Sequence, residues 1–157
     1  MECDVFNQVE FIELINLYLG PTAASVADFV YRELGIEDNV LLILSSLAVD
    51  GNLRGNTCLD LSILGSSIHA KKKSAALNEP IILPPLEELL QRLHQTPVLV
   101  ECVSVEDLVL SSASSAARSF VLLGNNLFTR RQFVDELSVA TNLTNRHRLF
   151  SETIAVD

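Results

Sequence analysis

The stretch "FVLLGNNLFTRRQFVDEL", residues 120–137, carries the signals for a strand, a tight turn, a second strand and a helix. Two short apolar runs flank Gly124-Asn125, and such a residue pair favours a two-residue hairpin loop because both residues tolerate positive φ. Two arginines follow directly and begin a helix that we expect to run to about residue 143. The stretch therefore predicts a β-hairpin that leads straight into a helix.

Three apolar segments at helical spacing lie upstream of this hairpin, and a glycine follows each of them. They predict helices over roughly residues 9–19, 22–34 and 40–50. The third segment, "VLLILSSLAVD", is apolar nearly all round, which is typical of a helix that is buried on every side. We expect it to form the centre of a small helical bundle.

The remaining segments complete an α+β prediction: an N-terminal helical bundle, then a helix and a small antiparallel sheet with a β-hairpin. "LEELLQRL" predicts the helix, and "VLVECVSV" predicts a further strand. We expect one domain. Its predicted parts are a helical half over residues 1–64, a loop or connector over 65–83, the helix, sheet and closing helix over 84–143, and a tail over 144–157.

Composition limits the classes of function. The formal net charge of −9 in 157 residues repels phosphates at long range. We therefore do not expect this chain to provide the main binding site for nucleic acid. Three widely spaced cysteines without a CxxC pair indicate reduced thiols. No signal-peptide pattern and no apolar run of about 20 residues is present. We expect a cytoplasmic protein that does not contact a membrane.

Common cofactor signatures are missing from the sequence. A phosphate-binding loop needs a glycine-rich turn before its lysine, and none precedes Lys71–Lys73, so we interpret these lysines as a solvated loop rather than a phosphate contact. No histidine has a metal ligand three or four positions away, so no metal site is predicted. The histidines are His69, His94 and His147.

A cysteine-dependent hydrolase would need Cys58 or Cys102 beside a histidine and a carboxylate. No spacing in the sequence supports either arrangement. We therefore interpret Cys58, within "NTCLDL", as a small core residue, and we keep the hydrolase as a third hypothesis.

The arginine pair at the start of the closing helix allows two interpretations. One arginine can contact a partner or nucleic acid, or it can pair with Asp135 or Glu136 across a helical turn. Because Arg131 and Asp135 are four residues apart, we expect Arg131 to brace the hairpin against the helix. Arg130 is then the candidate contact for a partner or for DNA.

"LLGNNLFTRRQFVDE" resembles a pattern near the end of the N-terminal domain of the exodeoxyribonuclease V alpha subunit, RecD, and of related RecD-like helicases. In that family a glycine turn leads to a Leu-aromatic strand, then an arginine, an aromatic residue and a glutamate. The aromatic residue is usually Trp in the family and is Phe133 here. The matching positions are Gly124, Leu127, Phe128, Arg131, Phe133 and Glu136.

A second segment, "GNTCLDLSIL", resembles the glycine, polar, small, Cys-Leu-x-Leu segment of the same family. It follows an Ala- and Leu-rich helix and precedes the first motif in the expected order. Asn56 stands where histidine is common in the family. The matching positions are Gly55, Thr57, Cys58, Leu59 and Leu61.

The resemblance implies part of a superfamily 1 ATP-dependent 5′-to-3′ DNA helicase that acts in double-strand break repair and recombination. ATP and Mg²⁺ would bind in domains beyond the N-terminal one, and we expect this chain to stop before them. The chain would then be a non-catalytic assembly domain without a cofactor. It would dock on the gamma (RecC-like) subunit and, through it, on the beta subunit, with weak or no DNA binding of its own.

A second hypothesis belongs to a different class. The chain would be a free-standing small helical adaptor, unrelated to helicases, and its apolar face would be covered by a second copy in a homodimer. The two motif matches would then be coincidental.

Overall fold

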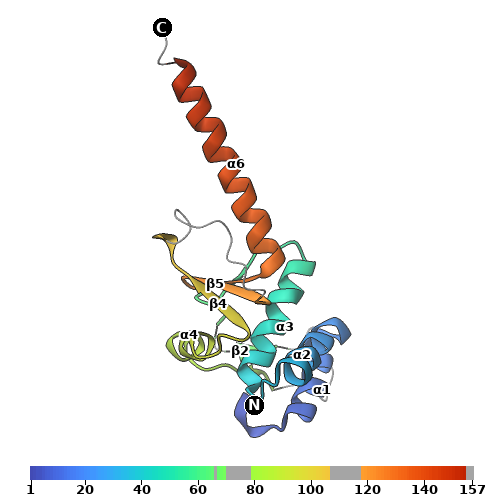
Figure 1. Cartoon of the computed structure of the whole chain (residues 1–157). Helices are drawn as coiled ribbons and strands as arrows, with labels where there is room; N and C mark the ends of the chain where they lie inside the picture. Colours follow the sequence, from blue (N-terminus) through green and yellow to red (C-terminus); the bar gives the residue numbers. More distant parts are fainter. Residues whose placement is uncertain (66, 70–78, 107–117, 155–157) are drawn as a thin grey trace.

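The computed structural model describes residues 1–65, 67–69, 79–106 and 118–154, with side chains through Arg148 in the last range. The predicted α+β class is confirmed: helices form the N-terminal part, and a small sheet follows them (Figure 1). Among the described residues, no helix has both the length and the apolar character that crossing a bilayer requires.

The three predicted N-terminal helices are confirmed, and polar side chains explain where the first and third begin, whereas the second begins at Pro21. The Asn7 side chain accepts a hydrogen bond from the backbone N–H of Glu10 at 3.0 Å and caps the first helix. Asp38 caps the third in the same way, accepting from Val40 at 2.9 Å. The bounds are α1 (Gln8–Leu19), α2 (Pro21–Leu34) and α3 (Asn39–Leu53).

Helix α3 is the buried centre of the fold, as its apolar sequence predicted. Every residue from Asn39 to Ser46 is buried. The buried hydroxyl of Ser46 lies within hydrogen-bond distance of two carbonyl oxygens to which it can donate, that of Ala23 at 2.8 Å and that of Leu42 at 2.9 Å. These bonds satisfy a polar group that would otherwise be costly inside the core.

The predicted hairpin is confirmed as β5 and β6, which pair in antiparallel fashion from Leu123↔Asn126 onward. Gly124, in the two-residue turn, has φ of 58°, a value that side chains disfavour. The sheet has the order β1-β6-β5-β4. The strand bounds are β1 (Leu59–Asp60), β4 (Val100–Val103), β5 (Phe120–Leu123) and β6 (Asn126–Thr129).

The sheet is mixed, whereas we expected it to be wholly antiparallel. Strand β4 runs parallel to β5, with Val100 opposite Phe120 and Val103 opposite Leu123. Parallel neighbours need a connection of about a dozen residues or more, and residues 104–119 provide that length. The low complexity of this connection concealed the crossover.

The predicted connector over residues 65–83 contains a second, two-stranded antiparallel sheet. The chain start joins it, because the N–H of Ile82 donates to the carbonyl of Met1 at 2.7 Å. Lys71–Lys73, interpreted as a solvated loop, lie outside the described residues. The elements here are η1 (Cys3–Val5), β2 (Ser67–Ile68) and β3 (Ile81–Ile82).

The closing helix is longer than predicted. Helix α6 (Arg130–Ile154) continues through most of the segment that we expected to be a tail. The physical reason is that no glycine or proline, the two strongest helix-ending residues, occurs after residue 129. In Figure 1, α6 projects away from the body of the molecule.

Arg92, near the end of α4 (Leu86–His94), joins this helix to two separate parts of the helical half. Its guanidinium lies 3.0 Å from a carboxylate oxygen of Asp4, 3.0 Å from one of Asp38 and 2.6 Å from one of Glu88. The Arg92 side chain is only 22% exposed. One cation therefore links the chain start, the cap of α3 and α4.

Replacing Arg92 with methionine is expected to lower the free energy of unfolding by about 1–2 kcal/mol, because three carboxylates lose their shared partner. Arg32→Met is the matched control: its single ion pair with Asp28 is largely exposed, and its loss is expected to cost under about 0.5 kcal/mol. Urea unfolding of both variants measures the difference. Equal costs would contradict the linking role of Arg92.

Burial and, to a smaller extent, the negative charge of Asp4 raise the pKa of the Cys3 thiol, while Arg92 lowers it; together they bring it from its ordinary value of 9.0 to about 12. Between pH 9 and 12 the folded protein therefore keeps a proton that the unfolded chain loses. The free energy of unfolding falls as pH rises through this window. Below pH 9 the thiol is protonated in both states, so it causes no change of stability with pH.

Cys3→Ala is expected to flatten the decline of the unfolding free energy above pH 9, which one thiol can steepen by at most about 1.4 kcal/mol per pH unit. Some decline remains, since burial also raises the pKa of Tyr18. Urea unfolding at several pH values measures the slope. Cys102→Ala is the comparison: this thiol is exposed and the upward shift of its pKa is smaller, so the slope is expected to flatten less than in Cys3→Ala. An unchanged slope in Cys3→Ala would show that Cys3 does not cause the decline.

Candidate functional site

The two segments that carry the family resemblance lie side by side in the structure. Strand β1, from "GNTCLDL", pairs in antiparallel fashion with β6, from "NLFT". Leu59 is opposite Leu127, and Asp60 is opposite Asn126. The N–H of Leu61 extends the contact by donating to the carbonyl of Asn125 at 2.9 Å. More than sixty residues separate the two segments in the chain, so only tertiary folding joins them.

The apolar motif positions hold α6 against this sheet. Leu127 is 1% exposed and Phe133 is 9% exposed. The rings of Phe128 and Phe133 meet edge to face, with centroids 5.6 Å apart. Such a contact adds about 0.5–1.5 kcal/mol beyond the burial of the rings. These motif positions therefore form the joint between β6 and α6.

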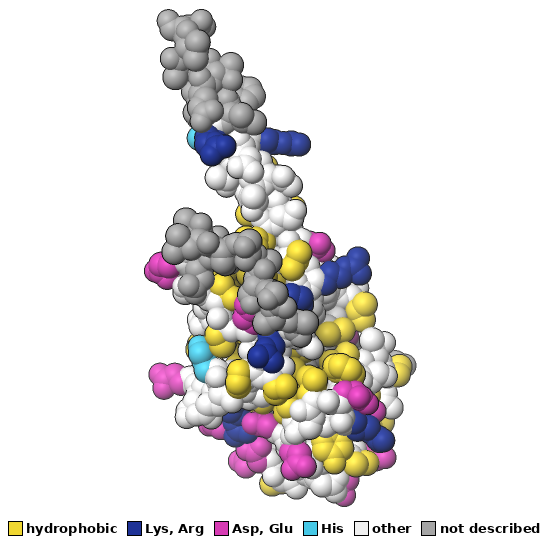
Figure 2. Space-filling view, viewed as in Figure 1, with side chains coloured by type: hydrophobic (Ala, Val, Ile, Leu, Met, Phe, Trp, Pro, Cys, Tyr) yellow, Lys and Arg dark blue, Asp and Glu magenta, His cyan; other side chains and the backbone are white. Residues whose placement is uncertain are grey.

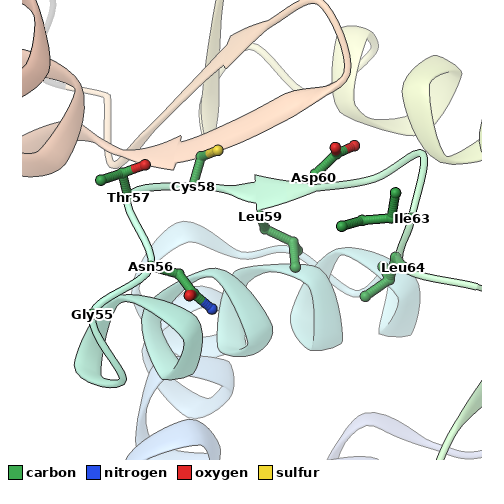
Figure 3. A pocket seen from close by; sticks show the side chains of 8 residues that line it. All are labelled: Gly55, Asn56, Thr57, Cys58, Leu59, Asp60, Ile63 and Leu64. Atoms are coloured by element: carbon green, nitrogen blue, oxygen red, sulfur yellow. The ribbon is translucent and has the colours of Figure 1, made fainter.

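An open hollow of about 600 Å³ lies beside β1 (Figure 3). Figure 3 shows Cys58 and Asp60 directed toward the hairpin, whereas Leu59 is directed toward α3. Gly55, at one end of the hollow, has φ of 91° and turns the chain from α3 into β1. Ile63 is 80% exposed at the other end.

Cys58 is half-buried at this hollow, and not in the core as its small size predicted. Its sulfur lies 3.7 Å from Oδ1 of Asn126. Burial raises the pKa of the Cys58 thiol; a hydrogen bond with Thr57 opposes this effect, and the charges of Asp60 and Glu136 add to it. The thiol is therefore protonated near neutral pH, the reverse of what a cysteine nucleophile needs.

The other groups considered from sequence are dispersed. Burial raises the pKa of Cys102, the second candidate nucleophile. A ring nitrogen of His94 lies 2.7 Å from the carbonyl of Leu90, within its own helix. In the part of the chain that the structure describes, no group of three metal-ligating side chains occurs.

The ion pairing of the two arginines differs from the prediction. Arg130 forms an ion pair with Glu101 of β4, and its Nε donates to the carbonyl of Arg118 at 3.1 Å. Arg131 is exposed and makes no hydrogen bond or ion pair with any described residue, so the predicted pair with Asp135 does not form. Helical spacing allowed the pair with Asp135, but the parallel strand β4 supplies a carboxylate to Arg130 instead.

Sequence reasoning missed Asn52. Its amide donates to the hydroxyl of Thr129 at 3.1 Å and accepts from the side chain of Gln132 at 2.7 Å. It thereby ties the end of α3 to the start of α6. No sequence signal singles out this residue, because asparagine between two glycines is typical of an ordinary turn.

Comparisons of the chain with protein-family models, curated proteins and solved structures found no match. Functional inference therefore depends on the two motif segments and on the joint that they form.

The ion pair of Arg130 predicts a difference between the adjacent arginines. Arg130→Gln is expected to lower the free energy of unfolding by about 1–3 kcal/mol, because it leaves the half-buried Glu101 carboxylate without its cation. Arg131→Gln, the matched control, is expected to change it by less than about 0.5 kcal/mol. Thermal or urea unfolding distinguishes them, and a larger loss in Arg131→Gln would contradict the bracing role of Arg130.

Proposed function

We propose that this chain is the N-terminal, non-catalytic assembly domain of a RecD-like ATP-dependent 5′-to-3′ DNA helicase subunit. The pairing of β1 with β6 carries the proposal, since it brings together the two segments that resemble this family. The parent subunit would act in the cytoplasm, within an exodeoxyribonuclease V complex for double-strand break repair and recombination. ATP and Mg²⁺ would be bound by other domains of that subunit.

The geometry of the motif supports this proposal for a physical reason. Leu127 and Phe133 are buried, and Leu59 packs against the core, so these positions need particular side chains to keep the joint closed. A pattern of this kind belongs to a fold and not to a catalytic reaction. It fits a domain whose role is to present surfaces to other proteins.

The surface fits a protein partner better than DNA. Figure 2 shows acidic side chains distributed over the helical body, in keeping with the net charge of −9. This charge repels phosphates, so DNA binding by the isolated chain is expected to be weak or absent. The proposed partner is the gamma (RecC-like) subunit and, through it, the beta subunit.

An apolar groove of about 370 Å³ between α2 and the start of β5 is the surface that we assign to the gamma subunit. Its walls include Val26, Phe29, Val49 and Phe120. Phe29 is 48% exposed in the unbound chain. Protein interfaces gain most of their affinity from a few apolar anchors that fill such pockets.

Co-expression with the gamma subunit of the same organism is expected to give a complex that survives gel filtration. Phe29→Ser, in the groove, is expected to weaken binding tenfold or more, about 1.4 kcal/mol or above. Leu17→Ser is the matched control, because Leu17 is 59% exposed on α1 and lies outside the groove.

Two outcomes would contradict the proposed function. One is the failure of the folded chain to bind the gamma subunit at micromolar concentrations. The other is Mg²⁺-dependent ATP hydrolysis by the purified chain, which an assembly domain lacks. The free-standing adaptor stays a prediction, and a gene without a nucleotide-binding loop downstream of residue 157 would favour it.

A further inference from the structure

The outer part of α6 is an exposed helix. Every residue from Ser138 to Arg148 is exposed, including Val139 at 55% and Leu143 at 61%. Figure 1 shows this part extending beyond the sheet and the helical body. A single helix in water gains little stability from its own hydrogen bonds, and most helices depend on packing of an apolar face.

Four exposed side chains of α6 form one stripe, which we call the α6 stripe: Glu136, Val139, Leu143 and Arg146. Their spacings of three, four and three residues place them on one face of a helix, as in the seam of a coiled coil. Its two apolar residues lie in the middle. An acidic residue lies at the end nearer the body, and a basic residue lies at the outer end.

This order of side chains is complementary to itself when it is reversed. In an antiparallel pair of α6 helices with a two-fold axis near Thr141, Val139 of each copy lies opposite Leu143 of the other. In the same register Glu136 lies opposite Arg146, and the symmetry makes both contacts twice. We propose that two copies of this chain associate through antiparallel pairing of their α6 stripes.

The charges select the antiparallel arrangement. A parallel pair in register would place Glu136 against Glu136 and Arg146 against Arg146, which is repulsive at both ends. Within one helix these two residues are about 15 Å apart along the axis, too far to pair with each other. Neither forms a hydrogen bond or ion pair with any described residue, so both charges are available to the second copy.

The net charge of the body does not prevent this pairing. Two copies with −9 each repel one another, but antiparallel pairing places the two bodies at opposite ends of the helix pair. The starts of the two α6 helices are then on the order of 30 Å apart along the axis, beyond a Debye length of about 8–10 Å. Figure 2 shows basic side chains, and no acidic ones, on the described outer part of α6 in that view.

The α6 stripe is short, so the pair is weak. An interface below about 1,000 Å² typically supports a transient complex, and we expect a dissociation constant on the order of micromolar. The pairing uses residues 136–146 and not the groove assigned to the gamma subunit. It therefore stands or falls independently of the proposed function.

Sedimentation velocity of the full chain from 1 to 200 μM, with variants of the α6 stripe, tests the pairing. The unaltered chain is expected to shift from monomer to dimer over this range. Glu136→Arg and Arg146→Glu, each alone, are expected to weaken association at least tenfold, because each places like charges opposite one another at both ends. Leu143→Ser is expected to weaken it similarly.

Mixing the two charge variants gives the decisive result. In a heterodimer of Glu136→Arg with Arg146→Glu, both end contacts join opposite charges again, so the mixture is expected to regain the dimer. Arg131→Glu is the control, because Arg131 is an exposed arginine of α6 outside the stripe. Circular dichroism confirms that each variant remains folded.

A monomer at every concentration, variants that associate as strongly as the unaltered chain, or a mixture that stays monomeric would each overturn the proposal. Co-elution with the gamma subunit reports separately on the proposed function, and the variants of the α6 stripe are expected to leave it unchanged.

Discussion

Helix α3 is stable only when it is surrounded, because nearly its whole circumference is apolar. The rest of the structure meets this constraint: α1 and α2 pack on it, the chain start and α4 contact it, and β1 and β6 contact it from the sheet. One hydrophobic core therefore includes residues from both the predicted helical half and the predicted sheet. The polar contacts of Arg92 and Asn52 lie around α3, near its start and its end.

The sheet extends this packing to the hairpin and to α6. Because β1 follows α3 directly and pairs with β6, the hairpin and the start of α6 are held in a fixed position relative to the bundle. Phe133 and Leu127 close that joint. The same placement positions the groove beside α2 and the projecting α6. The groove and the α6 stripe share no residues. The two proposed interactions, with another subunit and with a second copy, would therefore use different surfaces of one small chain.

The arginine pair illustrates where reading a sequence fails. Arg131 and Asp135 do lie four residues apart on one helix. An ion pair at this spacing stabilises a helix by only a few tenths of a kcal/mol, so the spacing alone does not make the pair form. Arg130 instead meets Glu101, twenty-nine residues earlier in the chain, because β4 lies parallel to β5. The same parallel pairing was invisible in sequence, and so was the role of Asn52. Each depends on which segments become neighbours, and no local pattern contains that information.

The sequence by itself determined the local elements: the three N-terminal helices, the buried character of α3, the hairpin at Gly124-Asn125 and the α+β class. Apolar periodicity, caps and turn residues act over a few positions, so they can be read from the chain directly. Only the tertiary structure decided the direction of β4, the pairing of β1 with β6, the partner of Arg130 and the extent to which α6 stands free. These features result from contacts between distant segments, and such contacts depend on how the whole chain buries its apolar surface around α3.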